Sequence, residues 1–167
     1  MIDYWEQRKK FQYYKAAIDL AHEFASDART AIDVGSGNTK FLQQVDWVAQ
    51  KTAVDLDVVP RIQGAKNHRI DFMKFQHLYM FDLVFCLQVL EHLELVHPFA
   101  KKLMCTGRII IISVPYKWPA DSCEWHLQDP IDEIKLLKWI GRQWFKSVIV
   151  EDEGNKRLVA AFAGNRG

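Results

Sequence analysis

The sequence predicts an α/β fold built on an open, mostly parallel sheet that is covered on both faces. Three short apolar runs have the composition of buried parallel strands: residues 31–34, 82–87 and 108–114. The first run ends at the turn Gly35-Ser36-Gly37, where glycine permits a tight bend and the close approach of a ligand. Residues 146–150 and 157–162 predict a hairpin around EDEGNK, so an antiparallel pair ends the sheet.

Length and composition limit what the chain can be. With 167 residues, 49% of them hydrophobic and 26% charged, it suits one globular domain, 1–167, with an N-terminal helix or lid at 1–27 and a core at 28–167. The net charge of +1 favours neither nucleic acid nor an anionic membrane as a partner. No apolar stretch approaches the roughly 18 residues of a membrane span. The three cysteines lack metal-ligand spacing, so we expect reduced thiols in a cytoplasmic protein.

Helical spacing predicts the elements that cover the sheet. Residues 4–25 predict an amphipathic helix, which packs against the sheet, closes over a ligand through Tyr4, Trp5 and Tyr13, or does both. A second helix is predicted over 38–49, directly after the glycine turn.

The second half of the chain continues the alternation of strands and helices. The elements expected there are a short or distorted helix within 58–68, a strand at 69–70, and helices over 93–104 and 130–140. The last helix is predicted to begin with Asp129 as N-cap and Pro130 as its first residue.

Acidic residues follow three of the predicted strands at their carboxyl ends, where ligands bind in open α/β sheets. Asp33 ends the first strand and faces the glycine turn. Asp55 ends the second, at about the 20-residue distance at which an acid binds ribose hydroxyls, and we prefer it to its neighbour Asp57. Asp71 and Phe72 follow the third strand, where a carboxylate and an aromatic ring suit an adenine.

Two histidines are candidates for a general base. His92 follows the fourth strand in the run Gln88–His92, and His126 lies in the aromatic loop 115–130 after the fifth. A loop this long in a compact domain is usually functional. We rank His126 first, because its loop would face a second substrate.

Four stretches, DVGSGNT, AVDLD, FDLVFCLQVLEHL and LMCTGRIIIISVP, resemble the class I S-adenosylmethionine-dependent methyltransferases in order and spacing. The resemblance covers residue 28 to the end. It implies a Rossmann-like, doubly wound sheet of seven strands with the last one antiparallel. Thr39 replaces the third glycine of the family's D/E-x-G-x-G-x-G motif, and Thr106 the first glycine of its L-x-x-G-G motif. The dinucleotide motif G-x-G-x-x-G departs further, since Lys40 stands at its third small position.

The resemblance implies S-adenosylmethionine as the cofactor. The residues it assigns are Asp33, Gly35, Ser36 and Gly37 for the methionine part, Asp55 and Leu56 for the ribose, Asp71 and Phe72 for the adenine, and Gln88 for the sulfonium side. Backbone amides at the start of the helix over 38–49 would meet the cofactor's carboxylate.

The implied activity is methyl transfer to an oxygen or nitrogen of a small organic or sugar-like acceptor, in a protein that could form a homodimer. Two alternatives stay open. One is a cofactor-binding subunit that is inactive alone, and the other is a dinucleotide-binding oxidoreductase.

The run Gln88–His92 also looks like the E-x-x-E-H element that some methyltransferases of this class use for a divalent ion, with Gln88 replacing the first acid. Glu91 and His92 could still bind a metal together with His126. We expect none, because a Glu-His pair that stabilises a helix start is the simpler interpretation.

Overall fold

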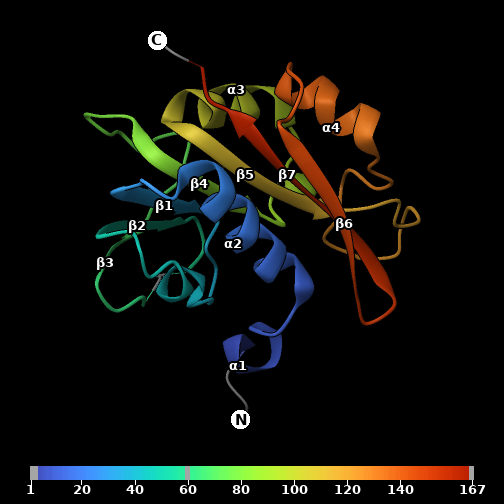
Figure 1. The fold of residues 1–167 in the computed structure, drawn as a ribbon. Helices are drawn as coiled ribbons and strands as arrows, with labels where there is room; N and C mark the ends of the chain where they lie inside the picture. Colours follow the sequence, from blue (N-terminus) through green and yellow to red (C-terminus); the bar gives the residue numbers. More distant parts are fainter. Residues whose placement is uncertain (1–3, 59–60, 166–167) are drawn as a thin grey trace.

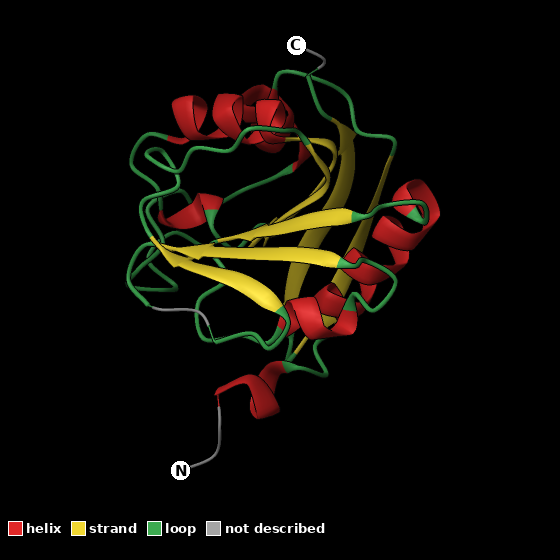
Figure 2. Cartoon of the chain, turned by 90° about the vertical axis from the view of Figure 1, so that its left-hand side faces the viewer, coloured by secondary structure: helices red, strands yellow, loops and turns green. Residues whose placement is uncertain are grey.

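Seven strands form one sheet with helices on both of its faces (Figures 1 and 2). The computed structural model describes residues 4–58 and 61–165. The elements are α1 (Tyr4–Arg8), α2 (Gln12–Ala25), β1 (Thr30–Val34), η1 (Phe41–Gln44), β2 (Gln50–Asp55), β3 (Ala65–Arg69), β4 (Phe81–Leu87), η2 (Leu90–His92), α3 (Val96–Thr106), β5 (Gly107–Pro115), α4 (Glu133–Ile140), β6 (Lys146–Asp152) and β7 (Asn155–Ala163). Among the described residues, no helix has the length and apolar character needed to cross a membrane.

The strand order is β3-β2-β1-β4-β5-β7-β6. Strands β1 to β5 are parallel, and β7 is antiparallel to both β5 and β6. The predicted fold class, a doubly wound seven-stranded sheet with an antiparallel last strand, is confirmed. The direction of winding reverses between β1 and β4, and in such sheets a crevice opens at the carboxyl ends of the two strands.

Each face of the sheet has its own hydrophobic core. Along β5, Ile110, Ile112 and Val114 belong to the core that contains α3 and α4, whereas Ile109 and Ile111 belong to the core that contains α2. Figure 2 shows these helices on opposite sides of the strands. A strand covered on both faces needs apolar residues at every position, which explains why this run is continuous rather than alternating.

The predicted N-terminal helix is interrupted between α1 and α2. The carboxylate of Asp152, at the end of β6, accepts the backbone N–H groups of Gln12 (2.6 Å) and Tyr13 (3.3 Å), so α2 begins where this distant side chain caps it. Trp5 and Tyr13 are buried, and only Tyr4 of the three proposed lid residues is exposed. The packing interpretation therefore describes this segment.

The helix predicted over 38–49 is absent, and that prediction was wrong. Only the 3-10 turn η1 forms, yet Phe41, Leu42 and Val45 are fully buried. The indole N–H of Trp47 donates to the carbonyl of Ala25 (3.2 Å) and fixes the segment against the end of α2. Tertiary contacts thus bury the apolar side chains without a longer helix, and no α-helix N-terminus follows the glycine turn.

Two further boundaries differ from expectation. The third strand begins at Ala65 instead of residue 69, and the described part of 58–68 has no helix; Pro60 lies outside the described residues. The N-cap of α4 is Asp132, whose carboxylate accepts the N–H of Lys135 (2.8 Å), rather than Asp129. The carboxylate of Asp129 bonds to His126 instead.

We expect Phe85→Ala to lower the free energy of unfolding by about 3–5 kcal/mol, because its fully buried ring packs edge-on against Phe41 (centroids 4.9 Å apart). Leu78→Ala removes a fully exposed side chain and should change the free energy of unfolding by no more than about 0.5 kcal/mol. Urea unfolding measures both values, and equal effects would contradict this description of the core.

Candidate active site

The loop after β1 is tied to the end of β2. The N–H groups of Gly35 (2.8 Å) and Ser36 (3.2 Å) both donate to the carbonyl of Val54. Asp55 continues this connection, since its carboxylate accepts the N–H of Gly37 (2.8 Å). The two loops therefore form one surface at the carboxyl edge of the sheet.

The glycines of this loop have different requirements. Gly35 has φ 76°, and an added Cβ would lie 2.4 Å from a Cγ of Val89, so close approach of the segment after β4 excludes a side chain. Gly37 has φ 52°, and no atom lies within 4 Å of where its Cβ would be. The loop therefore packs tightly on one side and borders open space on the other.

Thr39 occupies the third glycine position of the motif without disturbing the loop. Its hydroxyl donates to the carbonyl of Ser36 (2.8 Å), and its backbone N–H reaches the same oxygen (3.2 Å). Because no α-helix follows, there is no helix–strand contact for which a third glycine would be needed.

The polar groups beneath this loop have few protein partners. Asp33 is 3% exposed, and burial, with a smaller contribution from Asp55, raises the pKa of its carboxyl to about 7. The hydroxyl of Ser36 is buried without a hydrogen-bond partner among the described residues. An ammonium group placed here would favour the ionised form of Asp33.

Asp55 holds the loop after β2 as well as the loop after β1. Its second oxygen accepts the N–H groups of Asp57 (2.9 Å) and Val58 (3.0 Å). Leu56 is 60% exposed beside it and Asp57 is exposed. The carboxylate of Asp55 and the apolar side chain of Leu56 thus sit at the rim of the crevice.

The segment proposed for adenine is only partly open. Asp71 is half-buried, and its carboxylate accepts the N–H of Met73 (2.8 Å). Phe72 is 4% exposed and packs in the core against Phe99 (centroids 5.0 Å apart), with the Lys102 ammonium 5.1 Å from its ring. The ring of Phe72 presents no open face, and its contact with adenine stays a prediction.

Gln88 begins a chain of polar contacts across the carboxyl edge. Its backbone has φ 57°, unusual for a residue other than glycine, and its amide donates to the hydroxyl of Ser113 (3.1 Å). Its side-chain oxygen accepts Nε of Arg157 (3.3 Å), a 5% exposed guanidinium on β7. Tyr13 and Trp118 place ring centroids 5.1 and 5.3 Å from that guanidinium.

Arg157 was not among the predicted site residues. The signal in the sequence was an arginine at the start of the apolar run RLVAAF. Its partners are Gln88 after β4, Tyr13 of α2, Trp118 in the loop after β5 and the carboxylate of Asp152 on β6 (3.5 Å), which sequence spacing does not bring together.

His126 and His92 lie side by side, with ring centroids 4.9 Å apart. Nδ1 of His126 lies 2.6 Å from the carboxylate of Asp129, and the two side chains are 8% and 2% exposed. Nδ1 of His92 lies 2.8 Å from the carbonyl oxygen of Trp125. Both partners accept hydrogen bonds, so each neutral imidazole carries its proton on Nδ1 and keeps a lone pair on Nε2.

Glu91 completes this group. It is fully buried, and neither carboxylate oxygen has a hydrogen-bond partner among the described residues. One oxygen lies 4.0 Å from Nε2 of His92, and one ligand atom each of Glu91, His92 and His126 lie within 4.8 Å of one another. Burial, with a smaller contribution from Asp129, raises the pKa of Glu91 to about 8, and burial lowers that of His92. These three residues are the set that could hold a metal ion.

The structure thus gathers the predicted residues in two groups along one edge of the sheet. Asp33, Gly35, Gly37 and Asp55 form the first group, at the carboxyl ends of β1 and β2. His92 and His126 form the second group, after β4 and β5. Gln88 follows β4 and bonds to the neighbouring strand β5.

Comparisons with known proteins identify the fold. No protein-family model and no curated protein matches the chain. Among solved structures, the N-methyltransferase NodS from Bradyrhizobium japonicum WM9 in complex with S-adenosyl-L-homocysteine is 14% identical, with a TM-score of 0.73 over 99% of this chain and 94% of its own. The 1,6-didemethyltoxoflavin-N1-methyltransferase of Burkholderia thailandensis, with S-adenosylhomocysteine, is 17% identical, with a TM-score of 0.74 over 95% of this chain and 80% of its own.

Magnesium protoporphyrin IX methyltransferase from Synechocystis PCC 6803, with bound S-adenosylhomocysteine, is 13% identical, with a TM-score of 0.65 over 92% of this chain and 84% of its own. Together with the strand order, these likenesses show that the chain has the fold of the class I S-adenosylmethionine-dependent methyltransferases.

Proposed function

We propose that the protein binds S-adenosylmethionine and transfers its methyl group to an oxygen or nitrogen of a small organic or sugar-like acceptor. The observation that carries the proposal is the crevice at the carboxyl edge, where Asp55 holds the loop of Gly37 open beside the buried carboxyl of Asp33. The similar solved structures hold S-adenosylhomocysteine, the product of such a transfer, which supports the same cofactor here.

The chemistry of the crevice suits the methionine end of this cofactor. Its ammonium group would pair with Asp33 and could donate to the unpartnered hydroxyl of Ser36. Asp55 and Leu56 at the rim would contact the ribose, and Gln88 would lie on the sulfonium side. When bound, the cofactor supplies an activated methyl group on a positively charged sulfur.

We assign His126 as the general base. Asp33 and Ser36 would hold the cofactor, which would supply its methyl carbon to a lone pair of the acceptor oxygen or nitrogen and would keep the electrons of the carbon–sulfur bond on its sulfur. The acceptor's proton passes to Nε2 of His126, whose lone pair is free because Nδ1 faces Asp129. Asp129 is a positioning residue that fixes this tautomer and stabilises the imidazolium. His92 is the second candidate base.

A second candidate mechanism uses a divalent cation. Nε2 of His92 lies 4.0 Å from a carboxylate oxygen of buried Glu91, and one ligand atom of each of these residues and of His126 lies within 4.8 Å of the others. Both imidazoles have Nδ1 held by an acceptor, as is usual for metal-bound histidines. Such an ion would lower the pKa of an acceptor hydroxyl bound to it. Turnover that survives EDTA would support His126 acting alone, whereas loss restored by a divalent salt would support the cation.

The three free cysteines support a reducing compartment such as the cytoplasm. The single-domain organisation, a homodimer and the absence of nucleic acid as a partner stay predictions. The alternatives are an inactive cofactor-binding subunit and a dinucleotide-binding oxidoreductase.

We expect calorimetric titration to show binding of S-adenosylhomocysteine and none of NAD. Asp33→Asn should weaken that binding at least tenfold, since it removes a charge-assisted contact of about 1.5–3 kcal/mol. Asp57→Asn, which changes an exposed carboxylate nearby, is the matched control and should leave the affinity unchanged. Binding of NAD alone would refute the proposed cofactor.

We expect His126→Gln to lower the rate of methyl transfer about 10²- to 10⁴-fold while the affinity for S-adenosylhomocysteine stays the same. Asp129→Asn should lower kcat and shift the pH profile, because the imidazolium loses its stabilising charge. A methyl-donor consumption assay over sugars, phenols and amines measures the rate, with His68→Gln, an exposed site on β3, as the control. Full activity of the His126→Gln variant would exclude His126 as the general base.

We expect Glu91→Gln to flatten the dependence of stability on pH. Because the folded-state pKa of Glu91 is raised from 4.5 to about 8, the unfolded chain loses this proton first as the pH rises. The free energy of unfolding should therefore fall as the pH rises from 4.5 to about 8. The slope is at most about 1.4 kcal/mol per pH unit, the value for a difference of one bound proton between the folded and unfolded chain. Urea unfolding at pH 5 and pH 8 measures this change, with Glu94→Gln, at an exposed site, as the control. If the free energy of unfolding of Glu91→Gln changed with pH as much as that of the wild type, the prediction would be contradicted.

A further inference from the structure

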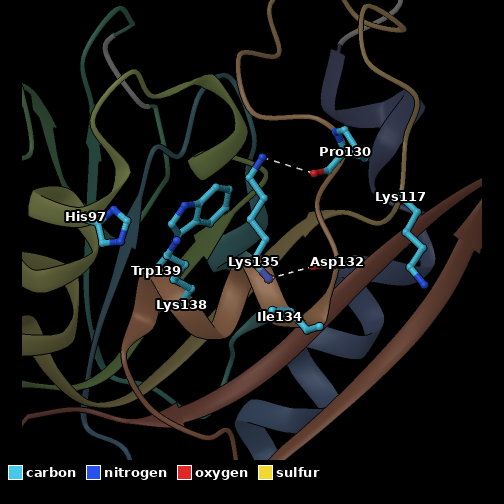
Figure 3. Close-up of a pocket in the computed structure, with 8 residues that line it drawn as sticks. All are labelled: His97, Lys117, Pro130, Asp132, Ile134, Lys135, Lys138 and Trp139. Carbon is cyan, nitrogen blue, oxygen red and sulfur yellow. Dashed lines mark hydrogen bonds between the residues drawn. The ribbon is translucent and has the colours of Figure 1, made fainter.

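A groove separate from the loops after β1 and β2 lies along α4, on the face of the sheet that α3 and α4 cover (Figure 3). It has a volume of about 590 Å³, within the range of small-molecule sites. Figure 3 shows His97, from α3, at one end and Lys117 at the other, with side chains of α4 between them.

The charge of the groove is unbalanced. Its walls carry Lys117, Lys135 and Lys138 against one carboxylate, Asp132, which already caps α4. No carboxylate of the described residues forms an ion pair with any of these three ammonium groups. Lys135 is occupied by the carbonyls of Gln128 and Pro130. The ammonium of Lys117 lies over the ring of Tyr116 (4.9 Å) and near Glu133 and Asp132, but Lys117 and Lys138 are both exposed and are the cations that a ligand can reach.

The surface between the cations is apolar. Ile134 is 76% exposed in the first turn of α4, and the largely buried indole of Trp139 lines the groove 5.4 Å from the Lys135 ammonium. An exposed isoleucine set among cations suits a ligand that is apolar along its body and anionic at an end.

The groove adjoins the proposed base through one short segment. Asp129, which orients His126, stands between Gln128 and Pro130, the two residues whose carbonyls Lys135 holds. Pro130 itself lines the groove. A ligand in the groove therefore lies against the segment that positions the catalytic pair.

We propose that this groove binds a small molecule that carries a carboxylate or phosphate on an apolar body. Lys117 and Lys138 pair with the anion, and Ile134 and Trp139 contact the body. Two sources share this chemistry, the far end of the methyl acceptor and a separate effector. Binding in the groove does not depend on the proposed methyl transfer.

Octanoate is the probe, and octylamine, of the same length and opposite charge, is the matched control. We expect octanoate to shift the indole N–H signal of Trp139 in the NMR spectrum of the ¹⁵N-labelled protein, with that signal assigned through Trp139→Phe. The double variant Lys117→Gln, Lys138→Gln should bind octanoate about 2- to 30-fold more weakly, which corresponds to the loss of two exposed ion pairs. Lys66→Gln with Lys74→Gln removes two exposed charges elsewhere and should change nothing.

Ile134→Glu provides a second test, since it places a carboxylate in the groove from an exposed position and should abolish the shift. Ile149→Glu, on the outer strand β6, is its control. Equal octanoate affinity in the wild type and the double lysine variant, or an equal shift with octylamine, would overturn the proposal.

Turnover assays then separate the two sources. Competition between octanoate and the methyl acceptor identifies the groove as part of the acceptor site, and simultaneous binding identifies it as an effector site. The octanoate titration needs no cofactor, so its failure leaves the methyl-transfer proposal standing. Failure to bind S-adenosylhomocysteine likewise leaves the groove proposal standing.

Discussion

The carboxylate of Asp55 is the contact on which the geometry of the crevice depends. It accepts backbone N–H groups from Gly37 on one side and from Asp57 and Val58 on the other. Two loops that leave adjacent parallel strands are thereby held at a fixed separation, while Gly35 is held against Val89. The loop can remain open beside Gly37 because its other contacts are fixed, and no helix is needed to support it.

Buried polar groups without partners concentrate along this same edge. Of the described residues, Ser36, Glu91, Asp129 and Arg157 all bury at least one side-chain atom that makes no hydrogen bond. Each such atom lowers the stability of the folded chain by about 1–3 kcal/mol. The unpartnered atoms of Ser36, Glu91 and Asp129 therefore lower the stability of this region, and bound ligands are the partners that would restore it.

Local sequence predicted the elements whose own residue pattern is distinctive. The continuous runs of β1, β4 and β5 and the final hairpin were recognisable, and Asp33 and Asp55 lie at the carboxyl ends of β1 and β2 as predicted. β3 was misplaced because its five residues, AKNHR, are largely polar, as an outer strand permits. The helix over 38–49 failed because tertiary burial of Phe41 and Leu42 replaced helical packing. The roles of Asp129 and Arg157 depend on loop geometry and on contacts between distant strands, which spacing alone does not contain.

The cap that Asp152 provides to α2 links residues 140 positions apart. During synthesis, the segment of α2 leaves the ribosome long before β6 and β7 exist, so it waits without its N-cap and without the strands it covers. Loop closure over such a separation is slow, and the apolar side of α2 stays exposed until it occurs. The β6–β7 hairpin therefore completes a helix that is translated well before it.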